Sequence, residues 1–219
     1  MHPYERWITR RYLAIALRSK RGQGGRPNEY LRAWTGAHGR SLGVPPLKYR
    51  SDSGLGSEYD SPAAKLKFKA EWKRWRTATL ASAVEPRPPI SPLQKRIDWL
   101  GDIFDLNPSQ RFLLGLFARI ARVQQVRNLV SAINKQGQGS EQFDYSELRP
   151  ALDKQVNRRD LSENGVLTRL GLIEKDDSDN FQVSELVGTM LSMKRLATPL
   201  PNNGRGQFKS GGGSGATAT

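Results

Sequence analysis

The sequence contains no cysteine and only two histidines, His2 and His38. The absence of cysteine excludes disulfides and thiolate metal sites, and it favours a reducing, cytoplasmic location. One histidine lies next to the first residue and the other in a glycine-rich stretch, which leaves little material for a histidine metal cluster or a Ser–His pair. We therefore expect no cofactor and no catalytic site.

Long hydrophobic runs and phosphate-binding loops are missing as well. No apolar run approaches the roughly 18 residues that a membrane-spanning helix needs, so no membrane span is expected. Neither Gly36–Ser41 nor the segment around Lys209 has the glycine spacing of a phosphate-binding loop. The aspartates between 176 and 179 lack the glycine and the terminal glutamate of a calcium-binding loop. These absences favour a binding protein over an enzyme.

The positive charge is concentrated in the first part of the chain. The formal net charge is +14. Residues 1–94 contain 18 Lys and Arg against 7 Asp and Glu, whereas residues 95–200 contain 15 against 14. Because basic proteins often bind nucleic acid, nucleic acid is a possible partner of the N-terminal half.

Composition and turn signals divide the chain into four segments. Residues 5–19 are expected to form a helix, and most of 20–60 is expected to be loop or conditionally disordered. The segments are a basic N-terminal arm of one or two short helices and loops (1–60), a basic and aromatic helix with a proline-rich linker (61–90), a winged-helix-like domain (91–200) and a flexible tail rich in glycine and serine (201–219).

The helix expected over 61–84 carries the best candidate for a nucleic-acid surface. Its aromatic residues fall within about 60° of a helical wheel, and a basic stripe fills roughly the adjacent 80°. Such a pair of stripes is typical of a surface that stacks bases and binds phosphates. Alternatively, the aromatic residues pack on the second domain and the lysines line its rim. The candidate nucleic-acid-binding residues, here and in the second half, are Lys65, Lys69, Trp72, Lys73, Trp75, Arg76, Arg158, Arg159 and Arg169.

The third segment has the clearest helix signals. Ser91-Pro92 and Asn107-Pro108 each combine a capping side chain with a proline at the first helical position, and Gln110 completes a capping box. An apolar face follows over 112–123, and a further apolar pattern runs over 126–133. We expect a mainly α-helical domain.

The remaining elements predict a small wing. Short helices are expected over 145–152 and 161–170, with Gly171 ending the second. The β-prone pairs Leu172-Ile173 and Phe181–Val183 flank a polar turn and predict a hairpin. Ser184 then caps a closing helix. This order of elements is winged-helix-like.

The runs Gln110–Phe117, Leu167–Glu174 and Phe181–Ser184 resemble the winged-helix region that precedes the ATPase module in a group of bacterial AAA-type ATPases. The resemblance covers about residues 92–200. The phosphate-binding loop and acidic magnesium motif that follow in this family are absent from the sequence. The resemblance therefore implies an accessory or N-terminal piece of an AAA-type machine, without ATPase activity of its own.

Two binding functions compete for the winged-helix-like domain. A DNA-reading winged helix places basic and amide side chains on its second helix and cations on its wing. Here the helix over 161–170 contains one cation, Arg169, and the wing tip contains three aspartates that would face phosphates. We therefore expect a non-catalytic module that docks a protein partner, with a basic arm that binds nucleic acid nonspecifically. The alternatives are a DNA-binding winged helix and a structural subunit that neutralises an acidic partner; the oligomeric state stays open.

Overall fold

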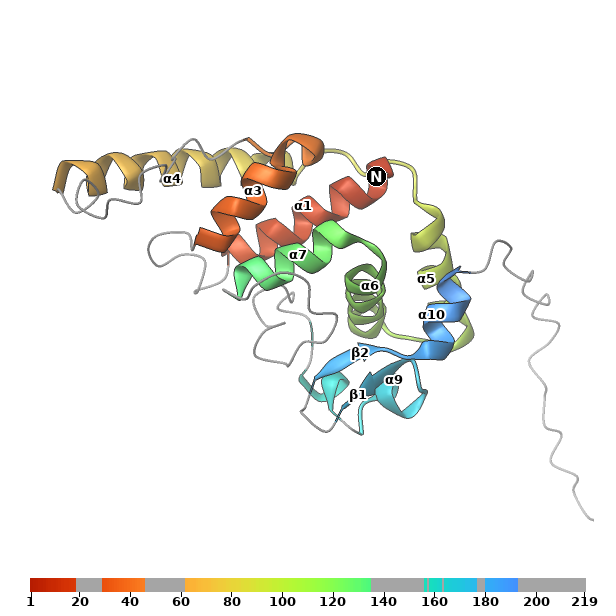
Figure 1. The fold of residues 1–219 in the computed structure, drawn as a ribbon. Helices are drawn as coiled ribbons and strands as arrows, with labels where there is room; N and C mark the ends of the chain where they lie inside the picture. Colours follow the sequence, from red (N-terminus) through yellow and green to blue (C-terminus); the bar gives the residue numbers. More distant parts are fainter. Residues whose placement is uncertain are drawn as a thin grey trace, which may run out of the picture.

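The computed structural model describes residues 1–18, 29–45, 62–134, 156, 158–162, 164–176 and 180–192. The described chain is mainly helical with one two-stranded antiparallel sheet, which confirms the predicted mainly α class. The tail after 192 and the helix expected over 145–152 lie outside the described residues. The elements (Figure 1) are α1 (Pro3–Arg18), α3 (Glu29–Leu42), α4 (Pro62–Ser82), α5 (Pro92–Ile103), α6 (Pro108–Arg122), α7 (Gln124–Ile133), a 3₁₀ helix (Arg158–Leu161), α9 (Val166–Arg169), β1 (Ile173–Lys175), β2 (Phe181–Val183) and α10 (Glu185–Ser192).

The predicted caps of α5 and α6 are confirmed. The Ser91 hydroxyl accepts a hydrogen bond from the Gln94 backbone N–H at 3.0 Å. The Asn107 side chain accepts from the Gln110 N–H at 2.9 Å, and the Gln110 side chain accepts from the Asn107 N–H at 3.0 Å. Each cap satisfies amides that a helix leaves without intrahelical partners, so these local signals place both helix starts.

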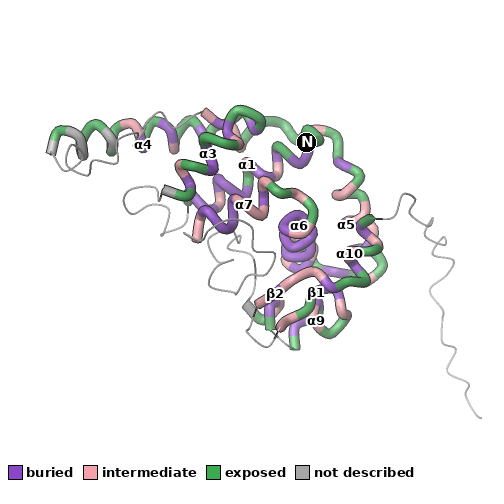
Figure 2. The backbone as a smooth tube through the Cα atoms, viewed as in Figure 1, coloured by how far each residue is buried: buried purple, intermediate pink, exposed green. Residues whose placement is uncertain are grey.

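Helix α6 is the centre of the fold. All residues from 113 to 120 are buried, and Figure 2 shows α6 as a continuous buried segment surrounded by other elements. Helices α5, α7, α9 and α10 and strand β2 all contact it. A helix that is buried on nearly every side depends on these neighbours for its stability.

The N-terminal helices pack into the same core. Leu13 and Leu17 of α1 and Trp34 of α3 belong to one hydrophobic cluster with residues of α5, α6 and α7. The Trp34 indole N–H donates to the Gln125 carbonyl on α7 at 3.0 Å. The expected helix over 5–19 is confirmed, but α1 is packed against the core and does not extend from it as an arm.

Helix α3 corrects the expectation that most of residues 20–60 is loop, for the part of that segment that the structure describes. It continues to Leu42, so Gly36–Ser41 is helical and His38 lies in a helix, not in a loop. Glycine disfavours helix, which weakened the sequence signal. Burial of Leu31, Trp34 and Leu42 against the neighbouring helices outweighs that cost.

The proline-rich linker lies along α1. The Trp7 indole N–H donates to the Glu85 carbonyl at 3.0 Å, and Arg10 forms a 2.6 Å ion pair with the Glu85 carboxylate. The Arg87 guanidinium lies 5.3 Å from the centre of the Tyr4 ring. The segment that joins α4 to α5 is therefore held by contacts with the first helix.

The hairpin forms as predicted, with Ile173 paired to Val183 and Lys175 to Phe181. The Phe181 ring lies 6.4 Å from the Phe117 ring of α6, so the sheet packs on the central helix. Ser184 caps α10, since its hydroxyl accepts from the Val187 N–H at 3.3 Å.

The expected continuous helix over 161–170 is wrong. The chain forms a 3₁₀ helix, a turn and the single-turn α9. A Cβ on Gly165 would lie 2.6 Å from the Asp160 carbonyl oxygen, so the turn brings backbone to a position that only glycine can occupy without displacement. Gly171 ends the segment with a φ of +64°, as its predicted role requires.

Candidate functional site

The two tryptophans expected to stack bases are covered. Trp72 and Trp75 are 8% and 4% exposed, and their rings stack on each other with centroids 4.9 Å apart. The Trp75 indole N–H donates to the Pro45 carbonyl at 2.7 Å. Helix α4 packs on α1, so the rings fill the N-terminal layer and not a surface of residues 91–200. Their faces are not open to bases.

The predicted cations of α4 divide into two groups. Arg76 is half-buried, and its Nε donates to the Leu17 carbonyl of α1 at 3.1 Å, so it anchors the helix. Lys69 and Lys73 are exposed. Lys65 lies in the first turn of α4, but its side chain is outside the described residues.

Two further exposed cations on α4, Lys67 and Arg74, were missed by sequence reasoning. They lie on the other side of the wheel from the basic stripe of Lys69 and Lys73. At 100° per residue, Lys67 and Arg74 are about 20° apart and lie between about 100° and 160° from the two lysines of that stripe. A count of every cation on the helix, not only those beside the aromatic residues, would have found them. The exposed part of α4 is therefore basic on two sides.

The first half of α4 extends beyond the other described helices (Figure 1). Its described side chains up to Ala70 are exposed, whereas burial begins at Trp72 (Figure 2). The second half of the helix is thus an anchor and the first half is a projection.

The remaining predicted cations lie elsewhere. Arg169 is exposed on α9, Arg159 is exposed on the 3₁₀ helix, and Arg158 lies in that helix with its side chain outside the described residues. Figure 1 places α9 on the far side of α6 and α7 from α4. The nine candidates therefore do not form one site.

The face around α9 is apolar as well as polar. Val166 of α9 and Leu170, which directly follows this helix, are 38% and 39% exposed, and Leu186 at the start of α10 is 60% exposed. At the hairpin, the Asp176 carboxylate accepts hydrogen bonds from the Asn180 backbone and side-chain amides at 2.9 and 3.1 Å. That contact closes the turn; Asp177 and Asp179 lie outside the described residues.

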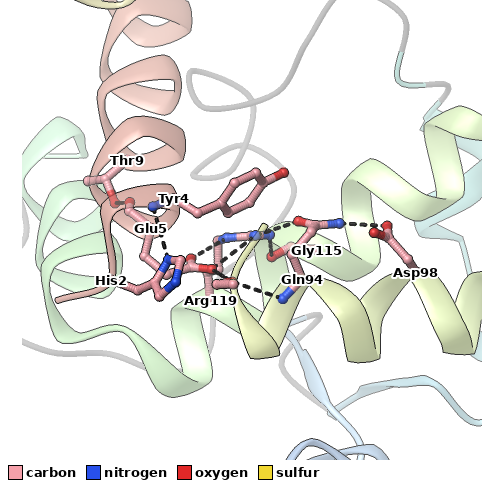
Figure 3. A network of polar contacts seen from close by, with 9 residues as sticks. His2, Tyr4, Glu5, Thr9, Gln94, Asp98, Gly115 and Arg119 are labelled. Atoms are coloured by element: carbon pink, nitrogen blue, oxygen red, sulfur yellow. Dashed lines mark hydrogen bonds and ion pairs between the residues drawn. The ribbon is translucent and has the colours of Figure 1, made fainter. Parts of the chain in front are cut away.

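A buried polar network joins α1, α5 and α6 (Figure 3). The Arg119 guanidinium donates to the Glu5 carboxylate at 2.7 Å, to the Gln94 side-chain oxygen at 2.6 Å and to the Gly115 carbonyl at 3.0 Å. The Ser91 hydroxyl also donates to Glu5. The cap of α5, the central helix and the first helix therefore meet at one ion pair.

The environment of Arg119 keeps this group charged. Burial alone disfavours the guanidinium cation, but Tyr12 and the Glu5 carboxylate favour it, so the pKa of Arg119 lies above its usual value. Each of its nitrogens donates to an oxygen. The network is thus a structural junction, with its donors and acceptors used internally. The sequence signal was an arginine on the apolar face of an amphipathic helix.

His38 lies between α3 and α7. Its ring is 5.7 Å from the Trp34 ring, and its Nε2 lies 3.5 Å from the Asn128 amide nitrogen. Partial burial lowers the pKa of His38 below its ordinary value. In the described part of the chain, no three His, Asp or Glu side chains are grouped to hold a metal ion. Among the described helices, none is long and apolar enough to cross a membrane.

Comparisons with protein-family models, curated proteins and solved structures found no match to this chain. The resemblance to the winged-helix region of AAA-type ATPases therefore stays a prediction. Two groups of exposed side chains in the described residues are relevant to function: the cations of α4, and the aliphatic side chains at α9 and at the start of α10.

Proposed function

We propose that this protein is a non-catalytic binding module, an accessory or N-terminal region of an AAA-type ATPase machine. Its winged-helix-like half docks a protein partner, and its basic N-terminal half adds nonspecific affinity for nucleic acid. We take the partner to be an ATPase module, because the region that residues 92–200 resemble precedes such a module in that family.

The observation that carries the docking proposal is the character of α9. This helix follows the turn at Gly165, where a winged helix would place its recognition helix, and it is only one turn long. Val166 in the helix and Leu170 directly after it are exposed, and Arg169 is its one cation. Readout of a base edge depends on polar and basic side chains carried into the groove by such a helix. Exposed aliphatic side chains instead favour contact with another protein.

The start of α10 also has an exposed aliphatic side chain. Leu186 is 60% exposed, directly after the hairpin that packs on α6. Val166, Leu170 and Leu186 therefore lie on short elements that are fixed by the hairpin and by the central helix. A docking surface benefits from such a rigid support, because less ordering is required when the partner binds.

The test is a binding titration between the full chain and the AAA-type ATPase module encoded in the same genome, in the same reading frame or the next. We expect saturable one-to-one binding by calorimetry. Val166→Asp with Leu170→Asp should weaken it at least tenfold, since charges replace apolar contacts. The matched control is Val84→Asp, at a valine that is 73% exposed just beyond α4.

Two results would contradict the docking proposal: no such module encoded nearby, or a module that fails to bind the full chain. Equal loss in the Val84→Asp control would assign the effect to charge and not to the α9 surface. Sequence-specific duplex binding that Arg169→Gln abolishes would instead favour the DNA-binding winged helix.

A further inference from the structure

The projecting half of α4 has no packing role that accounts for its composition. Its described side chains up to Ala70 are exposed, Glu71 is half-buried, and α1 is the main described element that contacts the helix. Between residues 62 and 76 the sequence has six Lys and Arg and a single acidic residue, Glu71. Within the described residues, Lys67, Lys69, Lys73 and Arg74 take part in none of the ion pairs. An exposed helix with this charge is suited to bind an anionic partner.

The positions of the cations around the helix indicate how negative charge is arranged on the binding partner. Lys69 and Lys73 lie about 40° apart on one side, and Lys67 and Arg74 about 20° apart on the other. A membrane-surface helix concentrates its cations on one face and its apolar residues on the opposite face. Here cations occupy both flanks, so the anion has to lie on both sides of the rod.

Duplex DNA offers this arrangement. Its major groove is about 12 Å wide and bordered by two phosphate rows, and an α-helix with its side chains is about 10–12 Å across. Helix α4 could lie between those rows with Lys69 and Lys73 facing one strand and Lys67 and Arg74 facing the other. The major groove of A-form RNA is too deep and narrow for side chains to read, so it fits this helix poorly.

The burial of Trp72 and Trp75 removes both rings as a stacking surface for single strands. Proteins that hold single strands stack bases on exposed aromatic rings. Trp72 and Trp75 instead stack on each other beneath the helix and are nearly buried. Their burial anchors the second half of α4 on α1 and leaves Lys73 and Arg74 exposed beside the anchor, with Lys67 and Lys69 exposed in the first half.

We propose that residues 62–74 of α4 insert into the major groove of duplex DNA and bind its two phosphate rows without reading the sequence. This inference deepens the nucleic-acid part of the proposed function and rests on it. Side chains in this segment reach phosphates from both flanks of one helix, and the body of the protein stays outside the groove.

The experiment measures fluorescence anisotropy of the full chain with a random-sequence DNA duplex, the matching single strand and the matching RNA duplex, each across a salt series. The DNA duplex is expected to bind tightest. Four phosphate contacts predict a slope of log affinity against log salt of about −3 to −4. Affinity should vary less than about threefold among unrelated duplex sequences, as expected for phosphate contacts without base contacts.

Matched variants separate the surface from net charge. Lys67→Gln with Lys69→Gln and Lys73→Gln should lower duplex affinity more than tenfold and make the salt slope shallower by about 3. Arg6→Gln with Arg40→Gln and Lys95→Gln removes the same charge from exposed positions on α1, α3 and α5, and should lower affinity less than about threefold. Circular dichroism checks that both variants keep their helix content.

Several outcomes would overturn the groove inference. These are equal losses in the two variants, single-strand or RNA-duplex binding as tight as duplex binding, or stronger competition by polyglutamate than by duplex DNA at equal charge. Tight single-strand binding would leave the nucleic-acid part of the proposed function in place and remove only the groove. If no nucleic acid binds, that part fails too, whereas the docking titration with the ATPase module is unaffected.

Discussion

Glu5 of α1 and Arg119 of α6 form an ion pair with side chains only 7% and 2% exposed, across 114 positions of sequence. Ser91, which caps α5, donates a hydrogen bond to Glu5, and Gln94 of α5 accepts one from Arg119. The pair therefore fixes the position of α1 on α6.

Removing the charge of Glu5 should strongly destabilise the fold. Glu5→Gln leaves the buried Arg119 cation without its anionic partner, and breaking a buried pair in this way costs about 3–5 kcal/mol. The measurement is the free energy of unfolding in urea. Glu85→Gln is the matched control, because it removes the half-exposed partner of Arg10 and should cost less than about 1 kcal/mol. Equal costs for the two variants would mean that the Glu5 pair is not buried in solution.

Truncating the central helix tests the core. Phe117 is 1% exposed and contacts the Phe181 ring of the hairpin. Phe117→Ala should lower the free energy of unfolding by about 3–5 kcal/mol, through lost burial and the cavity left behind. Ile103→Ala at a side chain that is 51% exposed should change it by less than about 1 kcal/mol. Cooperative unfolding of Phe117→Ala near the wild-type midpoint would refute this core assignment.

Alanine substitutions at two glycines should change the stability of the protein in opposite directions. A Cβ at Gly165 meets backbone oxygens of Asp160 and Ser162 at 2.6 and 2.8 Å, so Gly165→Ala requires the turn before α9 to shift and should destabilise by about 1–3 kcal/mol. A Cβ at Gly36 in α3 meets nothing within 4 Å, so Gly36→Ala should stabilise by about 0.5–1 kcal/mol. Thermal unfolding of the two variants checks both signs, and stabilisation by Gly165→Ala would contradict the close approach.

His38 should make stability depend on pH near neutrality. Its pKa is lowered by burial from the ordinary value of 6.5, so the unfolded chain binds a proton more readily than the folded one. The stability that neutral His38 contributes to the fold is fully present above pH 6.5, and it is lost as the pH falls through the folded-state pKa of His38. The free energy of unfolding should therefore decline on acidification, and His38→Gln should reduce this decline. An unchanged pH profile in His38→Gln would show that the ring is equally exposed in both states.

The parts of the fold that sequence could predict have local causes. The starts of α5 and α6 follow from capping side chains and prolines within four residues of each other, and the hairpin follows from two β-prone runs around a polar turn. Helix α4 was placed to within two residues by the proline at its start. Such signals act within one turn of chain, so they survive without knowledge of the tertiary structure.

The parts that were missed depend on distant contacts. Gly36 and Gly39 argue against a helix locally, and α3 forms because Trp34 is buried against α7 about 90 positions later. Trp72 and Trp75 have the spacing of a base-stacking stripe, and only their packing on the N-terminal layer shows them to be an anchor. The burial of these tryptophans defines the inward side of α4, and exposed cations then lie on both flanks of that side.

The packing of α1 against α6 also sets an order of events during synthesis. Glu5 leaves the ribosome long before Arg119, which is 114 residues later in the chain. At about 5–20 residues per second, roughly 6 to 23 seconds pass before the partner helix is made. During that interval α1 can pack against α3 and α4, which are made earlier, but its partners on α6 do not yet exist. Helix α1 thus completes its buried contacts only after α6 has been made.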